Sequence, residues 1–329
     1  MPDAVETMAY AGQTPWHGLG QKVDDNLTPA EMLMAAQLDW TVSKRRVHVQ
    51  SANSTDMLTT DDYFMLVRDS DDQVLGPAGK SYVPVQNAEV FEFFDKFVKA
   101  GDMTLETAGS LNGGRQVWGL ANIRKGFTLP GGDEVQGHLL IAHPHIWGKA
   151  MTIMFTPIRV VCNNTLVAAL GGAGDRFRFP HVKAWDGDVM EAAEQALGLA
   201  SNQLDDFRQQ AEILTKTEYT EKQLNAYLAR IFNPVAIKDA NKNLQYSPLE
   251  WEFDRTQFNR TMDNVFTCIR TQPGAELSEG TWWSALNAVT YYVDHKAGRD
   301  RDSSLQAAWF GGRAVTKRAA LQLAMEYAA

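Results

Sequence analysis

Apolar residues recur at alternating steps of three and four through the middle of the chain. This period of 3.5, sustained for over three heptads, predicts a long helix that packs lengthwise. Its partner is either another helix of the same chain or a second subunit, and packing within the chain is the simpler case. The positions of this seam are Met190, Ala193, Leu197, Ala200, Leu204, Phe207, Ala211 and Leu214.

The first third of the chain alternates between helical and strand patterns. Thr28, Pro29 and Glu31 form a capping box with proline at the first helical position, which predicts a helix to about Leu38. Strands are expected over 40–50, 62–69 and 81–86, and Asn87 caps a helix with apolar positions at 90, 93, 94, 97 and 98. The connections are too short for crossover helices, so the three strands form an antiparallel meander.

More strands follow, and then mostly helices. Asn112-Gly113-Gly114 predicts the turn of a hairpin over 103–123. A second pair is expected at 127–129 and 135–142, and a further strand at 150–155. A short helix is predicted from Asn164 or Thr165 to Leu170, with later helices near 220–232, 255–271, 279–296 and 314–328.

These patterns predict an α+β fold. Residues 1–183 form an antiparallel, strand-rich core with packed helices, and residues 184–329 form a helical region suited to packing or oligomerisation. The linker signals between the two are weak, so a single shared core is the alternative.

Composition places the chain among globular proteins. Its 329 residues are 44% hydrophobic and 22% charged, enough to bury a large core. No window approaches about 18 uninterrupted apolar residues, and Met1–Gln13 lacks the features of a secretory signal. Only two cysteines occur, Cys162 and Cys268, which favours a reducing, cytoplasmic setting.

The net charge of -9 argues against a protein that coats nucleic acid, but the charge is segregated. Residues 107–183 hold eight Lys and Arg against three Asp and Glu, whereas 187–294 hold nine against sixteen. A second basic cluster closes the chain over 296–318. A polarised chain of this kind is able to bind a polyanion, although a solvated surface of mixed charge explains the counts equally well.

Motifs for catalysis are weak. His143 and His145 are separated by one residue on a predicted strand, so their side chains point to the same face of the sheet. Together with Cys162 they are weak candidates for metal ligands. The acidic pairs at 24–25, 61–62 and 71–72 lie in turn-like segments, where aspartate is favoured for local reasons. The Gly171–Gly174 run lacks the residues that complete a phosphate-binding loop. The sequence therefore assigns no catalytic residues and no cofactor.

Basic residues interleaved with aromatics are the strongest functional signal. Aromatic side chains stack on the nucleobases of a single strand, and neighbouring Lys and Arg side chains neutralise its phosphates. Together they hold single strands without sequence preference. The predicted contact residues are Lys44, Arg46, Arg115, Trp118, Trp147, Lys149, Arg159, Arg176, Arg178, Arg313 and Lys317.

Several motifs resemble a phage- and plasmid-borne family, domain of unknown function 932. They are Pro15–Gly20, the helix from Thr28 that leads to Trp40, Arg159–Leu166, and the C-terminal Thr281-Trp282, Asn287–Thr290, Asp294-His295 and Phe310-Gly311. The resemblance covers nearly the whole chain. It implies an origin on mobile elements and supplies no characterised activity.

A looser, architectural similarity leads to phage single-strand annealing recombinases of the RecT and Erf types. A helix, a three-stranded meander and a following helix resemble their core, and such proteins assemble into rings or filaments on single-stranded DNA. We therefore expect a single-stranded-DNA-binding or annealing protein that acts in DNA recombination and forms a homo-oligomer.

Two alternatives remain open. The first is a non-enzymatic anti-defence or regulatory factor that binds a host or phage protein through an exposed 190–214 seam or the acidic 187–294 region. The second is a metal-dependent nuclease built on His143, His145 and nearby carboxylates.

Overall fold

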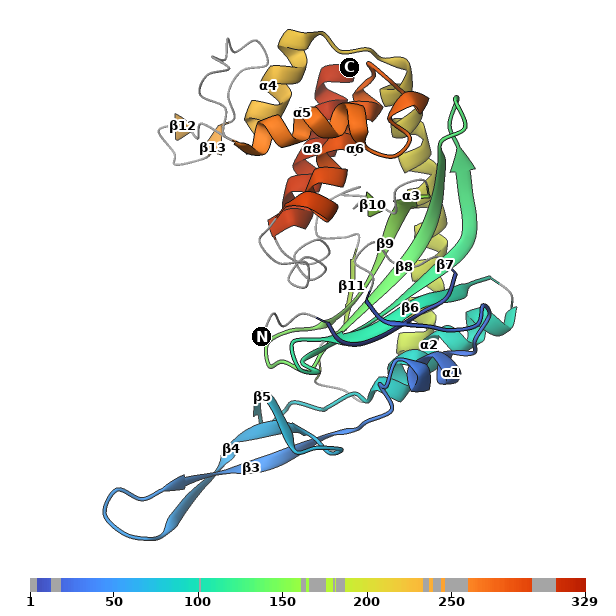
Figure 1. Cartoon of the computed structure of the whole chain (residues 1–329). Coiled ribbons are helices and arrows are strands. Elements are labelled where there is room, and N and C mark those ends of the chain that lie inside the picture. Colours follow the sequence, from blue (N-terminus) through green and yellow to red (C-terminus); the bar gives the residue numbers. More distant parts are fainter. Residues whose placement is uncertain are drawn as a thin grey trace. The chain divides into compact units, whose positions relative to one another are not determined.

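The computed structural model describes residues 5–12, 19–100, 102–160, 164–165, 176–179, 181, 187–232, 237–238, 244–245, 260–297 and 312–329. The fold is α+β, with most strands in the first half of the chain and most helices in the second, as the sequence predicts (Figure 1). The chain forms two compact units. Unit 1 comprises 1–125, 137–155 and 171–201, and unit 2 comprises 126–136, 156–170 and 202–329.

The larger sheet is built mainly from antiparallel neighbours in the order β10-β9-β8-β7-β6-β1-β2, and β11 also pairs with β9. Its strands are β1 (Val5–Tyr10), β2 (Gln21–Lys22), β6 (Thr104–Leu111), β7 (Gln116–Thr128), β8 (Glu134–Pro144), β9 (Met151–Arg159), β10 (Asn164–Thr165) and β11 (Arg176–Phe179). The expected 103–123 hairpin is confirmed as β6–β7, and Asn112, Gly113 and Gly114 all adopt positive φ in its turn.

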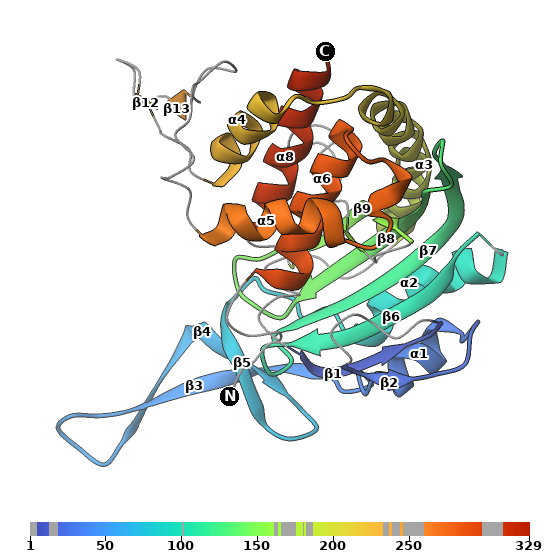
Figure 2. The ribbon, with the colours of Figure 1, turned by 45° about the horizontal axis from the view of Figure 1, so that its top comes forward.

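In unit 1, two helices cover one face of this sheet (Figure 2). They are α1 (Pro29–Ala35) and α2 (Asn87–Ala100). The predicted capping box of α1 is confirmed, since Thr28 Oγ1 accepts from the Glu31 amide at 3.3 Å and Glu31 accepts from the Thr28 amide at 2.8 Å. Buried Phe91 and Phe94 of α2 pack against the face of β7 near Gly119.

The small sheet of unit 1 is the expected antiparallel meander, but its third strand differs from the prediction. Its order is β3 (Val42–Gln50), β4 (Met57–Arg68) and β5 (Gln73–Gly79). Residues 81–86 are not a strand, because Pro84 and the turn at 80–81 follow β5 directly. The turn-rich 73–79 segment supplies the strand instead, since backbone pairing with β4 outweighs its weak strand propensity.

Unit 2 is mainly helical. It contains the C-terminal part of α3 (Gly187–Lys216), followed by α4 (Glu221–Phe232), α5 (Arg260–Thr271), η2 (Ala275–Leu277), α6 (Trp282–Tyr291), the π-helical turn η3 (Tyr292–Lys296) and α8 (Gly312–Ala328), with a short β12 (Ile237–Lys238) and β13 (Leu244–Gln245) pair. Trp282, Trp283 and Tyr227 are fully buried at its centre. Within the described residues, no helix is long and apolar enough to span a membrane.

The structure corrects one local prediction and confirms another. Asn164 and Thr165 form the strand β10 against Ile158 and Arg159, so they do not cap a helix; the rest of the predicted 164–170 helix lies outside the described residues. The 190–214 seam is a helix as predicted. Its positions Leu204, Phe207, Ala211 and Leu214 are buried, which confirms packing within the chain.

Candidate nucleic-acid interface

Two aromatic side chains meet on the surface of unit 1. Tyr63 of β4 and Trp147 lie edge to face, with ring centroids 6.3 Å apart and an interplanar angle of 75°. Tyr63 is 54% exposed and Trp147 is 50% exposed. Large aromatic rings are normally buried, so a pair that stays half open to solvent is available to a ligand. We call these two side chains the aromatic pair.

The indole of Trp147 packs against Gly79. This glycine lies directly opposite Tyr63 in the β4–β5 ladder, and Trp147 ring atoms stand 3.4 and 3.5 Å from the point that a Cβ on Gly79 would occupy, which is ordinary van der Waals distance. Trp147 thus lies against the β4–β5 ladder at the position of Tyr63.

A tight turn after β8 presents Trp147 and Lys149. The Lys149 amide donates to the Ile146 carbonyl at 3.1 Å, and Gly148 takes the left-handed conformation that the turn requires, with φ of +77°. The His145 amide donates to the Arg115 carbonyl at 2.8 Å. This bond holds the turn against the β6–β7 turn, so the backbone of Arg115 lies beside the turn that carries Trp147.

Three basic side chains near the aromatic pair are exposed and hold no ion pair within the described part of unit 1. They are Lys80, Arg115 and Lys149. Lys80 follows Gly79, the residue against which the indole of Trp147 packs. Uncommitted bases are the ones that gain most from neutralising a phosphate, because they give up no internal partner.

Other bases of the same region are already engaged. Lys44 donates to the carbonyls of Lys80 and Tyr82 at 2.7 and 3.1 Å and lies over the Phe64 ring at 4.7 Å. Arg46 pairs with Asp61 at 3.3 Å in an exposed salt bridge. Such surface pairs are weak, so Arg46 is able to exchange its partner for a phosphate at little cost.

Arg178 is the remaining described base on unit 1 from the predicted set. It is exposed on β11, directly opposite Thr152 of β9. The side chain of Arg176, on the same strand, lies outside the description. The structure thus brings Arg46, Arg115, Trp147 and Lys149 to unit 1 surfaces, together with Tyr63 and Lys80, which the sequence analysis had not selected.

Three predicted contact residues are buried, which revises the predicted interface. Trp118, Arg159 and Lys317 are 0%, 0% and 1% exposed. Trp118 packs over Gly109 in the core of unit 1, where a Cβ on the glycine would stand 2.3 Å from its ring. Sequence spacing alone does not tell a buried aromatic from an exposed one.

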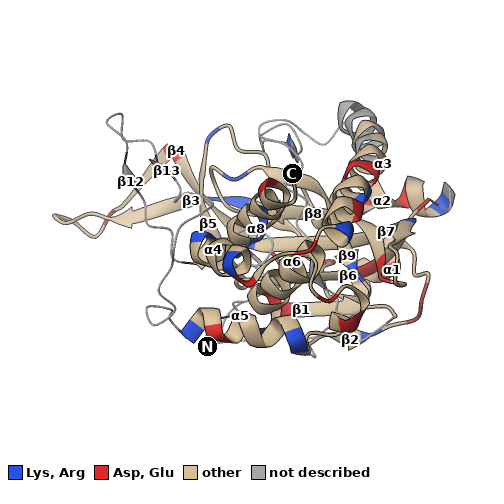
Figure 3. Cartoon of the chain, turned by 90° about the horizontal axis from the view of Figure 1, so that it is seen from above, with Lys and Arg blue, Asp and Glu red and all other residues tan. Residues whose placement is uncertain are grey.

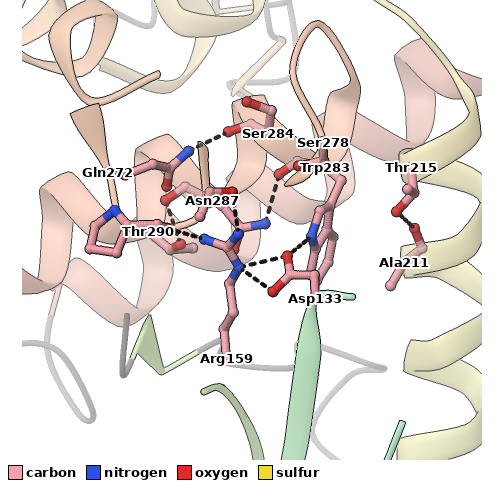
Figure 4. Close-up of polar contacts among 12 residues, drawn as sticks. Asp133, Arg159, Ala211, Thr215, Gln272, Ser278, Trp283, Ser284, Asn287 and Thr290 are labelled. Atoms are coloured by element: carbon pink, nitrogen blue, oxygen red, sulfur yellow. Dashed lines mark hydrogen bonds and ion pairs between the residues drawn. The ribbon is translucent and has the colours of Figure 1, made fainter. Parts of the chain in front are cut away.

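Arg159 is held in a closed network in unit 2 (Figure 4). Its Nε donates to both carboxylate oxygens of Asp133 at 2.9 and 2.7 Å, and its two terminal nitrogens donate to the carbonyls of Pro273 and Gly274, each at 2.9 Å. Trp283 Nε1 donates to Asp133 at 2.8 Å. These bonds engage all three nitrogens of the buried guanidinium with partners inside unit 2. Arg159 is therefore a structural residue that joins β9 to the α5–η2 connection.

Lys317 is also internal to unit 2. Its Nζ donates to Asp294 of the π-helical turn at 2.7 Å, and both side chains are almost fully buried. Burial lowers the pKa of Lys317, and the nearby Asp294 opposes this shift. Arg313 is half-buried and donates to the Ala297 carbonyl. This part of α8 therefore anchors the end of α6.

The predicted histidine pair belongs to a buried cluster in unit 1. His143 and His145 meet at 4.4 Å between ring centroids, and His181 joins them at 5.4 Å from His143. His143 Nε2 bonds the Val85 carbonyl at 3.0 Å, and His145 Nε2 bonds Asn87 Oδ1 at 2.9 Å. We call these three side chains the histidine cluster.

The histidine cluster is uncharged at neutral pH. Burial lowers the pKa of His143 to about 3, and burial also lowers the pKa values of His145 and His181. Across the described residues, no group of three or more His, Cys, Asp or Glu is arranged to hold a metal ion. The sulfur of Cys162, the third predicted ligand, lies outside them.

Charge elsewhere is mixed in sign. Figure 3 shows Lys and Arg interspersed with Asp and Glu along helices such as α3 and α5. On α5, Arg260, Asp263 and Arg270 illustrate this alternation. The charge on α5 is therefore not a one-sided basic stripe of the kind that marks a nucleic-acid surface.

Comparison with known proteins gives a family. A family model described as "Domain of unknown function (DUF932)" matches residues 74–314, well over half of the chain. No curated protein and no solved structure matches.

Proposed function

The chain belongs to the DUF932 family. From the geometry of unit 1 we propose that it binds single-stranded DNA through the aromatic pair and the Lys and Arg side chains around it. The observation that carries this proposal is the contact of half-exposed Tyr63 with half-exposed Trp147 beside the uncommitted Lys149 and Arg115. Aromatic faces stack on unpaired bases, and the flanking cations neutralise the backbone.

Single strands fit this surface better than duplex. The faces of bases in a duplex are covered by their neighbours, whereas a single strand exposes them for stacking. The arrangement contains no helix aimed at a groove and no row of side chains able to read base edges among the described residues. Binding should therefore show little sequence preference.

The biological setting is part of the same proposal. The resemblance of the chain's motifs to phage- and plasmid-borne sequences favours a role in recombination of mobile DNA, with annealing of complementary strands as the activity. A protein that holds strands with their bases accessible promotes pairing when it assembles in several copies. The net charge of -9 limits nonspecific coating of DNA, so binding would depend on this one surface.

The test is a titration of a labelled single-stranded oligonucleotide by fluorescence anisotropy at low salt. Trp147→Ala and Tyr63→Ala should each weaken binding by about 5- to 150-fold, since stacking contributes roughly 1–3 kcal/mol per base. Val74→Ala, at a position 46% exposed on β5 and outside the aromatic pair, is the matched control. Equal affinities for all three variants, or no binding by the unmodified protein, would rule out this surface.

A further inference from the structure

The β3–β4 hairpin extends beyond the sheet that supports it (Figures 1 and 2). β5 ends at Gly79, opposite Tyr63, and farther out, among the strands that the structure describes, β3 and β4 pair only with each other. The outer pairs are His48 with Thr59, Val49 with Leu58 and Gln50 with Met57. We call residues 47–59 the outer ribbon. An isolated two-stranded ribbon is at best marginally stable in water.

The outer ribbon exposes apolar side chains. Val49 and Leu58 are each 57% exposed, and Met57 is 56% exposed. Val49 and Leu58 are direct cross-strand partners, so they share one face of the ribbon. Apolar side chains gathered on a thin ribbon mark a surface that gains stability from a contact.

The outer edge of β3 is free for pairing over this stretch. At its base, Gln86 blocks the edge, accepting from the Val42 amide at 2.8 Å and donating to the Val42 carbonyl at 3.0 Å. Lys44, Arg45 and Arg46 then place charge along the strand, which disfavours an added strand there. From Val47 to Gln50 the strand carries no Lys, Arg, Asp or Glu, and no described strand pairs with this edge.

We propose that the outer edge of β3 pairs with the same edge of a second copy of this chain, antiparallel and with His48 at the twofold axis. In this register Val47 of each copy lies opposite Val49 of the other, and Arg46 lies opposite Gln50. No Lys or Arg side chain therefore faces another Lys or Arg across the contact. Pairs of β-branched residues stabilise antiparallel strands. The joined ribbons would gather four valines and two Leu58 side chains on one continuous face.

The same residues argue against nucleic acid as the occupant. Between Val47 and Thr59 the outer ribbon has no Lys or Arg, and its one fully charged residue is Asp56. A phosphate backbone would meet no cation there. A self-complementary strand of valines instead favours a twofold contact, in which one patch serves both partners. The inference does not rest on DNA binding at the aromatic pair.

The first test is sedimentation velocity of the full chain over a dilution series. We expect a concentration-dependent dimer, and Val49→Lys should raise its dissociation constant by roughly tenfold or more because the change enters the contact twice. Val74→Lys adds the same charge on β5, outside the outer ribbon, and should leave assembly unchanged. A monomer at every concentration, or equal assembly of both variants, overturns the proposal.

The second test fixes the register. His48→Cys places two thiols together at the twofold axis, so mild oxidation should give a disulfide-linked dimer. Thr59→Cys, on the inner strand directly opposite His48, is the matched control, and the unmodified chain reports on Cys162 and Cys268. Cross-linking by Thr59→Cys alone, or by neither variant, contradicts the pairing. A Val49→Lys variant that dimerises normally but gains oligonucleotide affinity would assign the ribbon to nucleic acid instead, because the added cation would then meet a phosphate.

Discussion

The backbone of His145 donates to the carbonyl of Arg115 at 2.8 Å and so ties two turns of unit 1 together. One turn carries Arg115 and the other carries Trp147 and Lys149, which lie far from Arg115 in sequence. A single backbone bond thus brings the turn that carries Arg115 next to the turn that carries Trp147 and Lys149. All three side chains are exposed, so basic residues from distant parts of the chain are available on neighbouring turns.

Because Arg115 and Lys149 hold no ion pair with any residue that the structure describes, each should contribute one phosphate contact. Arg115→Ala and Lys149→Ala are each expected to reduce the slope of log affinity against log salt concentration by about 0.7, the value per phosphate contact for single strands. Arg208→Ala is the matched control, because Arg208 is an exposed base of unit 2. Oligonucleotide titrations at four salt concentrations give the slopes. Slopes that stay unchanged in Arg115→Ala and Lys149→Ala would refute the assignment of these two residues.

Local sequence signals predicted the local structure well. The Thr28–Glu31 capping box and the Asn112–Gly114 turn depend on residues that are neighbours in the chain, and both are present. The predicted position of the third strand of the meander was wrong, because β5 forms through pairing with β4 and not through its own strand propensity. The strands β1, β2 and β11 were missed for the same reason, since each is short and is defined by a distant partner.

The candidate site was harder to predict than the fold. A sequence shows that Arg159 is basic, but it does not show that Asp133 and two carbonyls enclose it. The same holds for His181, which joins His143 only in the folded chain. Tyr63 was overlooked because it lies in an apolar strand pattern, where an exposed ring resembles a core ring. Side-chain exposure depends on tertiary packing, which periodicity alone does not supply.

The Arg159–Asp133 ion pair should control the stability of unit 2. Arg159→Ala leaves the buried carboxylate of Asp133 without its cation, so we expect a loss of about 3–5 kcal/mol in the free energy of unfolding. Arg208→Ala removes a base from the exposed pair with Asp205, 3.7 Å apart, and should cost less than about 1 kcal/mol. Urea unfolding followed by tryptophan fluorescence measures both.

A double variant separates the ion pair from simple loss of packing. Arg159→Met with Asp133→Asn removes both charges while keeping similar volumes, so it should be more stable than Arg159→Ala. Both variants lose the hydrogen bonds to Pro273 and Gly274. A double variant that is no more stable than Arg159→Ala would therefore show that the uncompensated carboxylate of Asp133 is not the source of the cost.

The histidine cluster should make unit 1 less stable in mild acid. Its pKa values are lower in the folded protein than the ordinary value of 6.5, and that of His143 is about 3. The unfolded chain therefore binds more protons between these values. The stability that the neutral histidines contribute is fully present above pH 6.5 and is lost as the pH falls from 6.5 toward 3.

Urea unfolding at pH 7.5, 6.5 and 5.5 tests this dependence. His143→Gln should flatten the fall in stability by roughly a kcal/mol per pH unit, since one fewer proton is taken up on unfolding. His181→Gln should do the same and keeps the test informative if the first variant does not fold. His48→Gln, at an exposed position, is the control. Identical pH profiles for the unmodified chain and both cluster variants would show that the histidines do not set the acid sensitivity.

Gly109 should be irreplaceable in unit 1, because Trp118 occupies the space of its missing side chain. A Cβ there would stand 2.3 Å from the Trp118 ring and 2.4 Å from the Thr7 carbonyl oxygen. The backbone oxygen belongs to β1, which pairs with β6 at this point, so neither neighbour is free to withdraw. Gly109→Ala should therefore cost about 1–3 kcal/mol of stability through overpacking. Gly76→Ala is the matched control, since a Cβ on this β5 glycine meets nothing within 4 Å and should change the stability little. Thermal and urea unfolding compare the two, and equal stabilities would mean that β1 and Trp118 shift to accommodate the methyl group.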